Sequence, residues 1–414
     1  MVVVGGGVVG LACAWELVRA GADVTVLERG ALGHGVSRGN TGWVVPSMTS
    51  PLPAPGMVRE GITQLVTRGG AFVLRPSPDP SFVRWLWQFW RNCDSARFDS
   101  GVRALLALNR RTLELFDRYL EDGIRFEMHS TGLLIVARSY EGLEHYRALF
   151  GRMRELGYEG GEPDELDGDE VAALEPAVDR RAVACGLHAR VDRYVRPETL
   201  MSGLATKLRD GGVEVEEGCE LVGLEQRGGR WVLDTTSGVK DADKVVVAAG
   251  LETDRLLRGR APRLRMQPAR GYSLTLEGSG TPPRHALYLA EARLGLSPFR
   301  QGVRIAGVFE LGAKRAEAPS DAGEKLLAAA RPYLAGWRPD SSGAVSAWAG
   351  LRPMTADGLP VIGELPGSRG LFVAAGHGML GVTLAPATAA LLAPLVLDGN
   401  AAPELAPFDP GRRA

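Results

Sequence analysis

Three glycines near the beginning of the chain have the spacing of a phosphate-binding turn. Gly5, Gly7 and Gly10 follow the apolar residues 1–4, which have the composition of a buried strand. In such a turn the first glycine permits a tight bend, the second lets backbone amides approach a pyrophosphate, and the third lets a helix pack closely on the strand. The pyrophosphate then lies at the positive end of the helix dipole. The spacing therefore predicts a dinucleotide site.

Glu28 supplies the acid that such a site requires. It lies about 20 residues after the glycine turn, where a carboxylate can accept both hydroxyls of an adenosine ribose. A free carboxylate there also disfavours the 2′-phosphate of NADP. Residues 11–20, between the turn and the acid, have the pattern of a helix that ends at Gly21. Strand, turn, helix and acid thus occur in the order expected for an adenine dinucleotide.

Later glycine-ended segments favour FAD over NAD. An NAD-binding fold usually continues with a second run of strand–helix units. Here the chain enters a Gly/Ser/Asn/Pro loop at residues 31–55, too long for a simple connection. The buried strand 245–250 and the glycine segment 374–381 return to the site instead. This arrangement is typical of an extended flavin dinucleotide, and a nicotinamide-dependent dehydrogenase is the remoter alternative.

The elements around these motifs predict an α/β (α+β) fold in which a Rossmann-like FAD-binding domain is interrupted by a second, mixed-sheet substrate domain. We expect the FAD-binding domain to comprise residues 1–50, 170–252 and 347–414. The remaining segments, 51–169 and 253–346, are expected to form the substrate-binding domain, with an acidic linker at 160–169.

Composition limits the classes of function. The chain has 414 residues, enough for two domains with sizeable cores, and its net charge of -1 gives no basic field for nucleic acid. Four cysteines without a CxxC pair indicate reduced thiols and no metal site. The apolar segment 384–397 is shorter than the ~20 residues of a membrane span. With no charged leader before an apolar stretch, we expect a cytoplasmic protein.

An aromatic stripe at helical spacing has two interpretations. Its members are Phe82, Trp85, Leu86, Phe89 and Trp90. The spacing favours a helix that packs these side chains into the core, and a peripheral membrane patch is the alternative. The sequence makes no prediction of oligomeric state.

Several segments together resemble the DAO-type flavoproteins, a family that includes D-amino-acid oxidase, glycine oxidase, sarcosine oxidase and the bacterial D-amino-acid dehydrogenases. The resemblance covers essentially the whole chain and is strongest to the dehydrogenases. It is carried by the glycine turn with Glu28, the loop 37–42, the strand 245–250, and the segments 51–56, 91–93, 348–358 and 376–381.

The resemblance implies that FAD binds non-covalently and contacts a defined set of residues. The pyrophosphate and adenosine would contact Gly5, Gly7, Val8, Val9, Gly10, Glu28 and Arg29. The middle of the cofactor would contact Ser37, Asn40, Thr41 and Gly42, with Leu221, Ala249 and Gly250 beside the adenine and the dinucleotide. The last helix would direct its amino end to the flavin O2/N1 edge, which gains negative charge on reduction. That contact would involve Gly376, Leu380, Gly381, Val382 and Thr383.

For substrate, the resemblance implies Arg352 as the residue that grips a carboxylate through a bidentate fork. Tyr272 and Tyr288 are weaker candidates, because a buried tyrosine with a paired hydroxyl is the commoner outcome. His377 either touches the flavin edge or is structural. Relatives similar to glycine oxidase carry a tyrosine where this chain has Arg293 and an arginine where it has Met379, so the second half of the carboxylate clamp stays open.

The implied reaction is oxidation of the Cα–N bond of an amino acid. Hydride passes from Cα to flavin N5, and the imine hydrolyses to a 2-oxo acid. The expected substrate is a D-amino acid such as D-proline or hydroxyproline, and glycine, sarcosine or another secondary amine is the alternative. The electron acceptor is either O2 or a quinone. Relatives that feed a respiratory chain associate with membranes, so peripheral contact with the inner membrane face stays open.

Overall fold

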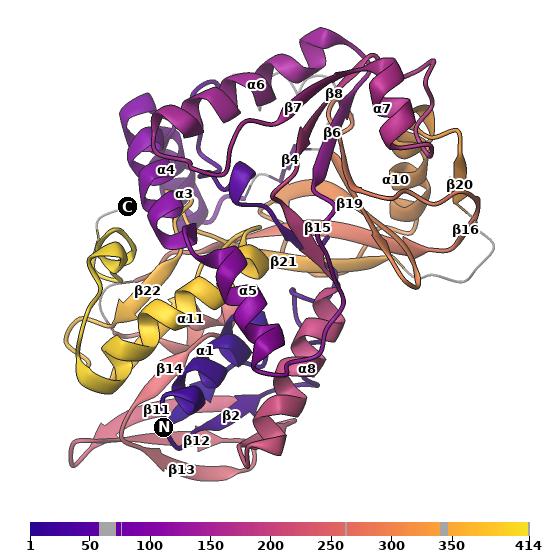
Figure 1. The fold of residues 1–414 in the computed structure, drawn as a ribbon. Coiled ribbons are helices and arrows are strands. Elements are labelled where there is room, and N and C mark those ends of the chain that lie inside the picture. The colour runs from indigo at the N-terminus through magenta and orange to yellow at the C-terminus, as the bar shows by residue number, and fades with distance from the viewer. Residues whose placement is uncertain (58–71, 76, 261–262, 340–346, 413–414) are drawn as a thin grey trace.

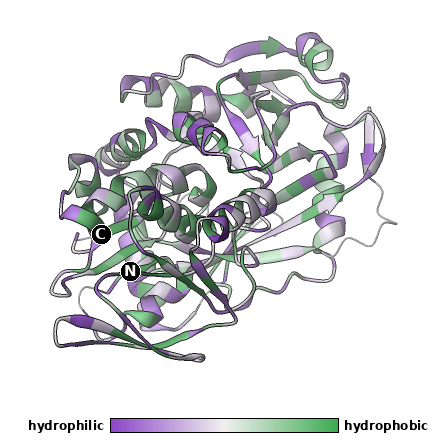
Figure 2. Ribbon diagram, turned by 60° about the horizontal axis from the view of Figure 1, so that its bottom comes forward, coloured by the Kyte–Doolittle hydropathy of each residue, from purple (hydrophilic) through white to green (hydrophobic). Residues whose placement is uncertain are grey.

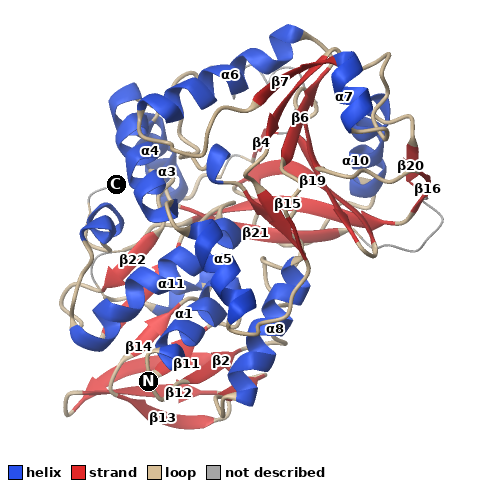
Figure 3. Cartoon of the chain, viewed as in Figure 1, coloured by secondary structure: helices blue, strands red, loops and turns tan. Residues whose placement is uncertain are grey.

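Two large sheets organise the computed structural model, which describes residues 1–57, 72–75, 77–260, 263–339 and 347–412. A six-stranded sheet lies in the lower half of the view in Figure 1, and a nine-stranded sheet lies in the upper half. Figure 3 shows helices packed beside both sheets. The predicted α/β (α+β) class and its Rossmann-like unit are confirmed.

The six-stranded sheet is the Rossmann-like unit. In spatial order its strands are β10 (Glu214–Glu217), β2 (Thr25–Glu28), β1 (Val2–Val4), β14 (Val245–Val247), β23 (Leu371–Ala375) and β22 (Val361–Glu364). All neighbours are parallel except β22 and β23. The central strands β1 and β14 are runs of valine buried on both faces, as expected for parallel strands.

Alternate residues of β1 serve different cores. Val3 packs into a helical layer that contains α1 (Val8–Arg19), α8 (Pro197–Asp210) and α11 (Gly381–Asp398). Val2 and Val4 pack on the other face, against the hydrophobic residues of a three-stranded sheet. That sheet consists of β11 (Leu221–Arg227), β12 (Arg230–Thr235) and β13 (Gly238–Ala242). The period of two along β1 therefore holds both layers in place.

The nine-stranded sheet is mixed. In order its strands are β21 (Trp348–Met354), β15 (Gln267–Leu276), β19 (Gly302–Leu311), β18 (Leu294–Phe299), β17 (Ala286–Leu289), β6 (Leu133–Ala137), β8 (Cys185–Ala189) and β7 (Asp164–Asp167), with β4 (Phe72–Leu74) beside β19. Its helices are α6 (Tyr140–Glu155), α7 (Gly168–Leu174) and α10 (Ala322–Ala330). Figure 2 shows hydrophobic residues along the packed elements and hydrophilic residues at many outer turns.

Short elements join the two halves. A small sheet pairs β3 (Trp43–Val44) with β9 (Arg193–Val195) and β9 with β5 (Met128–His129). Other short elements are η1 (Pro46–Met48), η2 (Gly250–Glu252), α9 (Thr253–Leu256), β16 (Gly278–Gly280), η3 (Arg331–Tyr333), β20 (Trp337–Pro339) and η4 (Pro403–Phe408).

Helix ends coincide with capping residues in the sequence. Asp94 accepts from the amide of Ala96 at 3.0 Å at the start of α4 (Ser95–Asn109). Asp167 and Glu170 form a reciprocal capping box that starts α7. Gly399 ends α11 in the left-handed conformation, at φ 76°. These capping residues mark the limits of the three helices in the sequence.

Several segments lie in a different half of the molecule from the one predicted. Strands β8 and β21 pair within the nine-stranded sheet, although 170–252 and 347–414 were assigned to the FAD-binding domain. Helices α4 and α5 (Thr112–Glu121), predicted within 51–169, pack instead on the helical layer with α11. Residues 160–169 contain β7 and the start of α7 rather than a simple linker. In each case the partner is distant in sequence, so local pattern does not reveal it.

Helix α3 (Pro80–Asn92) divides the aromatic stripe between the interior and the surface. Phe82, Trp85 and Phe89 are buried, and Trp85 Nε1 donates to the carbonyl of Met354 at 3.1 Å. The predicted packing into the core is therefore confirmed for these three side chains. The opposite face exposes Val83, Trp87 and Trp90, with exposed fractions of 55%, 52% and 59%.

Among the described residues, one helix is long and apolar enough to cross a membrane. It is α11, and 61% of that stretch is buried inside the protein. The core helix of a folded domain has the same character, and α11 packs closely on α1. The hydropathy of α11 therefore does not by itself identify this helix as a membrane span.

An ion pair fixes α5 to α1, and its removal tests that packing. Glu16 of α1 is only 2% exposed and accepts from Arg118 of α5. Arg118→Met is expected to lower the free energy of unfolding by about 2–4 kcal/mol, because the buried carboxylate loses a partner while the apolar stem is retained. Urea titration measures the change. Arg111→Met, which removes an exposed pair with Glu114, should be nearly neutral, and equal effects would contradict the assignment.

Candidate active site

A cavity of about 390 Å³ follows the carboxyl ends of β1, β2 and β14. This is where open parallel sheets bind dinucleotides. Most of the predicted cofactor residues line this cavity. They are Gly5, Gly7, Val8, Val9, Glu28, Arg29, Ser37, Leu221, Ala249, Gly250, Gly376 and Gly381.

The glycine turn leaves backbone where side chains would otherwise lie. Gly5 has φ 115°, and a Cβ there would lie 2.5 Å from the carbonyl oxygen of Ala248. A Cβ on Gly10 would collide with the carbonyl oxygen of Gly5, so α1 packs on the turn only because Gly10 has none. Gly7 begins α1 without a side-chain cap. Apart from the amide of Val8, which donates to Ser37 Oγ, the first amides of α1 are thus available to an anion.

Glu28, predicted to contact the adenosine ribose, lines this cavity. Its Oε2 accepts from the amide of Gly6 at 2.7 Å, and its Oε1 accepts from the amide of Gly30 at 2.9 Å. Arg29, the next residue, pairs with Glu252 at 3.7 Å and lines the same cavity. The glycine backbone, the uncapped helix start and this carboxylate fit an extended adenine dinucleotide.

The loop 37–42 connects this cavity to a second one. Ser37 Oγ lies 3.4 Å from the amide of Val8 at the start of α1. Asn40 Oδ1 accepts from the amide of Gly42 at 2.7 Å, which closes the loop on itself. A Cβ on Gly42 would collide with the carbonyl oxygen of Val195 on β9. The predicted Asn40, Thr41 and Gly42 segment is therefore tightly held, and Asn40 and Thr41 line the second cavity.

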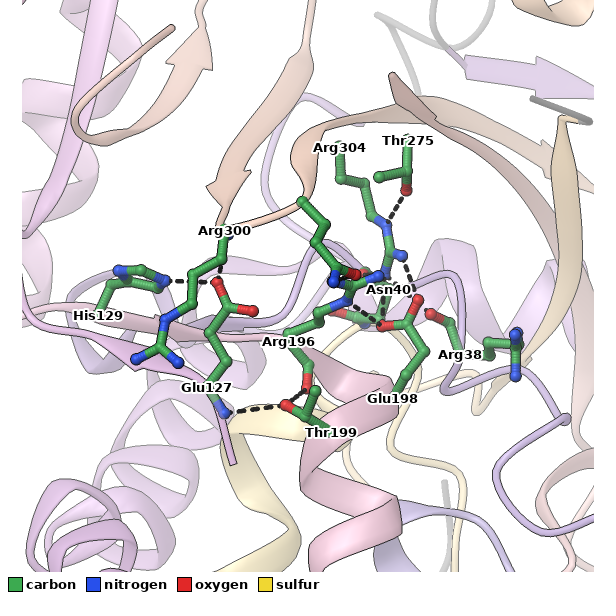
Figure 4. A network of polar contacts seen from close by, with 11 residues as sticks. Arg38, Asn40, Glu127, His129, Arg196, Glu198, Thr199, Thr275, Arg300 and Arg304 are labelled. Carbon is green, nitrogen blue, oxygen red and sulfur yellow. Dashed lines mark hydrogen bonds and ion pairs between the residues drawn. The ribbon is translucent and has the colours of Figure 1, made fainter. Parts of the chain in front are cut away.

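A buried arginine fixes this loop from the nine-stranded sheet (Figure 4). Arg304 of β19 is 4% exposed, and its Nη1 donates to the carbonyl oxygens of Arg38 and Asn40, each at 2.9 Å. Its Nη2 pairs with Glu198 at the start of α8, and its Nε donates to Thr275 at 3.0 Å. Sequence reasoning missed Arg304, because nothing local marks a strand arginine as buried.

Glu127 forms the other half of the network in Figure 4. Its Oε1 lies 2.8 Å from His129 Nε2 and accepts from the amide of Arg300 at 2.7 Å. Its own amide donates to Thr199 Oγ1 at 2.9 Å. These contacts hold three elements together: strand β5, helix α8 and the β18–β19 turn.

The second cavity, of about 340 Å³, adjoins the first. Both are lined by Val36, Ser37, Trp348, Gly350, Gly378 and Gly381. The indole of Trp348 lies against Gly39 and Gly350, where a Cβ on either glycine would collide with it. Trp348 therefore stands at the junction of the two cavities. The apolar wall of the second cavity includes Trp43, Val45, Met48, Leu52, Met57 and Phe309.

Arg352 lies in a socket at this second cavity. Its Nη1 donates to the carbonyl oxygen of Val308 at 3.1 Å, and its Cζ lies 5.9 Å from the centre of the Phe309 ring. Its guanidinium occupies the space above Gly271, where a Cβ would collide with it. Burial lowers the pKa of Arg352 to about 10, so it stays cationic at neutral pH. A desolvated, fixed guanidinium is suited to bind a carboxylate.

A strained bulge shapes this socket. Val308 has φ 64°, a conformation that is unusual for a β-branched residue. The pairing of β15 with β19 shifts register between Arg270 and Tyr272, opposite Val308. The bulge places the Val308 carbonyl within reach of Arg352. No sequence signal predicted it, because a valine in a strand is ordinary.

The weaker candidates have partners within the protein. Tyr272 donates to Glu310, which also accepts from Arg75 at 2.7 Å. Tyr288 lies edge-on to Trp43, with ring centres 5.6 Å apart. Both tyrosines line the second cavity, and burial raises the pKa of each. They are therefore neutral groups, and their role toward substrate stays a prediction.

His377 is oriented toward the final helix. Its Nε2 lies 3.0 Å from Thr388 Oγ1 of α11, and burial lowers its pKa to about 4. The ring is thus neutral at physiological pH. The contact with Thr388 fits a structural role, but His377 also lines the first cavity, so contact with the flavin stays a prediction.

Helix α11 starts at the same junction. Its N-cap, Leu380, provides no side-chain cap, and the amides at its start include those of Val382 and Thr383. Thr383 Oγ1 donates to the carbonyl oxygen of Trp43 at 2.9 Å, which ties the helix start to β3. Leu380, Gly381, Val382 and Thr383 line the second cavity. A helix start in this place can stabilise negative charge on a bound group.

The Arg304 contacts generate a prediction about cofactor retention. Arg304→Gln should loosen the loop at Arg38 and Asn40 and raise the dissociation constant of FAD, the predicted dinucleotide, about tenfold or more. FAD fluorescence titration measures this. Arg300→Gln, in the same hairpin but with an exposed side chain, should leave the constant unchanged. Equal FAD binding in the wild type and Arg304→Gln would remove Arg304 from this role.

Comparisons with known proteins identify similar chains. The D-amino acid dehydrogenase of Cereibacter sphaeroides is 34% identical over 430 residues, covering 100% of this chain and 97% of the relative. The enzyme of that name from Phenylobacterium zucineum is 32% identical over 422 residues, covering 98% and 95%. Glycine oxidase from Geobacillus kaustophilus has the same fold, with a TM-score of 0.73 and 24% identity over 100% of this chain and 98% of that one.

The family model described as "FAD dependent oxidoreductase" (DAO) matches residues 1–395. That match includes both cavities and every residue predicted to contact cofactor or substrate. The chain is therefore an FAD-dependent oxidoreductase and belongs to the DAO family.

Proposed function

We propose that this enzyme oxidises the Cα–N bond of a D-amino acid and passes the electrons to O2 or a quinone. The observation that carries the proposal is the fixed guanidinium of Arg352 in a cavity that adjoins the dinucleotide cavity. The relatives named as D-amino acid dehydrogenases, which match almost the full chain, support the D configuration.

Arg352 has the central task in this reaction. It binds the substrate carboxylate and thereby fixes the position of Cα relative to the cofactor. FAD, when bound, supplies the acceptor for the hydride that leaves Cα. The imino acid product hydrolyses in water to a 2-oxo acid and ammonia.

The described lining of the second cavity offers no obvious general base. It includes no aspartate, glutamate, lysine or histidine, and Tyr272 already donates to Glu310. The substrate amine is therefore expected to react in its neutral form. Rate then depends on alignment and exclusion of water rather than on a proton-abstracting side chain.

The side chain of the substrate is the open part of the proposal. The sequence favoured D-proline or hydroxyproline, with glycine, sarcosine or another secondary amine as the alternative, and all of these have neutral side chains. The aromatic and apolar wall around Trp43 and Met48 would accept a small ring.

Anaerobic bleaching of the bound flavin tests the proposed function. Purified holoenzyme is mixed with D-, L- and N-methyl amino acids, and loss of the flavin absorbance identifies the substrates. Air is then admitted, and prompt recovery of the absorbance indicates O2 as acceptor, whereas recovery only with a quinone analogue indicates a dehydrogenase. Failure of every amine to bleach the flavin would refute amine oxidation.

Replacing Arg352 tests its role directly. Arg352→Lys keeps a positive charge but loses the planar fork, so kcat/KM for carboxylate substrates should fall about 100-fold or more. The flavin spectrum and FAD content should be unchanged. Arg181→Lys, at a side chain that is 89% exposed, is the matched control. Unaltered kinetics in Arg352→Lys would exclude Arg352 from the site.

We further propose that α3 makes peripheral contact with an anionic membrane, such as the inner membrane face. Its outer face exposes Val83, Trp87 and Trp90 together with the basic residues Arg84 and Arg91. Trp87 also stacks with Arg91, whose Cζ lies 4.8 Å from the ring centre. Tryptophan beside arginine on one helix face is typical of elements that lie in the headgroup region.

Vesicle binding tests this contact. The double variant Trp87→Ser, Trp90→Ser should co-sediment with vesicles of phosphatidylglycerol and phosphatidylethanolamine about tenfold less than the wild type. Turnover with a soluble dye should stay the same. The control is Val222→Ser, Val239→Ser, which removes exposed hydrophobic residues from β11 and β13. Equal loss of binding in both double variants would contradict a role of α3.

A further inference from the structure

A two-point ion pair joins the segment 403–412 to the turn 355–359, which follows β21. Arg412 Nε lies 2.8 Å from Asp357 Oδ2, and Arg412 Nη2 lies 3.2 Å from Asp357 Oδ1. The two side chains are only 16% and 12% exposed. The family model matches residues 1–395, so the family resemblance gives this segment no role. A largely buried ion pair is costly to form, and its location therefore needs an explanation.

Arg412 holds the turn through further hydrogen bonds. Its Nη2 donates to the carbonyl oxygen of Leu359 at 2.7 Å, and its Nη1 donates to the carbonyl oxygen of Phe408 at 3.0 Å. Within the turn, Asp357 Oδ1 accepts from the amide of Leu359 at 3.0 Å, and Thr355 Oγ1 donates to the carbonyl oxygen of Leu359 at 2.8 Å. We call the contacts of Arg412 with Asp357 and Leu359 the Arg412 clamp. They offset the cost of burying the guanidinium and fix the turn.

Apolar packing holds the other end of the clamp in place. Leu405 and Phe408 of η4 are buried in the same core as α11. Pro410 lies against β22, where a Cβ built on Gly363 would be 3.0 Å from Pro410 Cδ. Arg412 therefore extends from a packed segment, and the clamp ties the turn to the core of the Rossmann-like half.

The clamped turn packs directly on the wall of the second cavity. A Cβ built on Gly358 would lie 2.8 Å from Pro53 Cδ and 2.9 Å from the amide nitrogen of Leu52. Gly358 has φ 74°, which glycine adopts without strain. Leu52 in turn lines the second cavity. A displacement of the turn is therefore transmitted to Leu52.

Arg352 is held by contacts that do not involve the clamp. Its strand β21 pairs along its length with β15. The amide of Gly378 donates to the carbonyl oxygen of Pro353 at 3.2 Å, and Arg352 itself donates to Val308. The guanidinium should therefore keep its place when the clamp is removed.

The turn 355–359 depends more strongly on Arg412. Its other polar contacts include a longer hydrogen bond, of 3.4 Å, from Asn92 Nδ2 to the carbonyl oxygen of Ala356. A hydrogen bond to a charged group contributes more to stability than one between neutral groups. Loss of Arg412 would also leave the largely buried carboxylate of Asp357 without this cation. The turn, and with it the support of Leu52, should then become mobile.

We propose that Arg412 is a positioning residue for substrate binding, which acts by clamping the turn that supports Leu52 in the wall of the second cavity. The inference rests on the proposed amino-acid oxidation, because that proposal places the substrate in this cavity. Since Arg352 is held separately, removal of the clamp should weaken substrate binding more than it slows hydride transfer.

Stopped-flow reduction of the bound flavin, without an acceptor, tests the proposal because it separates substrate binding from chemistry. The substrate is the amino acid that bleaches the wild-type flavin fastest. In Arg412→Gln its apparent dissociation constant should rise about fivefold or more, while the limiting rate of reduction changes by less than about twofold. Asp357→Asn should have the same effect. The double variant should be no worse than either single variant, since both residues act through one contact.

Amide hydrogen exchange gives a second readout that does not require turnover. The peptide that contains Leu52 should exchange about tenfold faster in Arg412→Gln than in the wild-type holoenzyme, because its support has been loosened. The FAD content of the two proteins should be equal. Arg412→Lys keeps the charge but loses the planar fork, and should restore part of the protection and of the substrate affinity.

Two control variants separate positioning from general stability. Glu404→Gln changes an exposed residue of η4 and should leave both readouts at the wild-type values. Arg118→Met removes the partner of the buried Glu16 in another part of the core. It should lower the free energy of unfolding without changing the substrate dissociation constant.

Different results would overturn different parts of the proposal. An unchanged dissociation constant in Arg412→Gln, with an active wild type, would exclude the positioning role and leave amino-acid oxidation intact. Unchanged exchange at Leu52 would refute the support of this residue by the clamp, whatever the substrate is. An equal rise of the dissociation constant in Arg118→Met would reduce the clamp to a contribution to stability. Failure of every amino acid to bleach the wild-type flavin would refute the proposed function itself. If Arg412→Gln does not fold, Arg412→Lys and Asp357→Asn still decide.

Discussion

The buried guanidinium of Arg304 is the contact on which the geometry of the site depends. It extends from β19 in the nine-stranded sheet and donates to two carbonyl oxygens of the loop 37–42. Its pairing with Glu198 adds the start of α8, an element of the Rossmann-like half. Burying one arginine is costly unless its donors are satisfied, and these partners satisfy them. The loop that borders both cavities is therefore fixed by both halves of the molecule, so the positions of the two cavities are set together.

The two cavities use different sources of positive potential. Around the dinucleotide cavity the donors include backbone amides at the start of α1, where Gly7 provides no side-chain cap, whereas the uncapped start of α11 lies at the second cavity. Around the second cavity the charges belong to arginine side chains, Arg293 and Arg352. Amides suit a cofactor that stays bound, since they are rigid and cost no rotamer entropy. Side-chain forks suit a carboxylate whose exact direction sets the reacting carbon.

Sequence predicted the parts of this site that local spacing encodes. The glycine turn and Glu28 are recognisable from neighbours along the chain, and Gly5, Gly7 and Glu28 line the first cavity. The predicted role of Arg352 came from a family motif rather than from spacing or composition. Arg304 and Glu198 form an ion pair although they are 106 residues apart in the chain, and neither local segment predicts this contact. The same holds for β8 and β21, which join a sheet formed mostly by other parts of the chain.

Backbone strain explains why the shape of the second cavity is hard to predict from the sequence. A valine in a strand and an arginine in a turn are unremarkable in sequence, yet Val308 and Arg293 both adopt left-handed conformations. Each such residue costs about 1–3 kcal/mol, which the surrounding sheet must supply. The neighbours of Val308 do so through the long pairing of β15 with β19 and β21. In return, the carbonyl of Val308 holds Arg352 beside Gly271, and the guanidinium does not need to be ordered when substrate arrives. Under the proposed function, the free energy that the bulge costs would be offset by tighter binding of the substrate carboxylate.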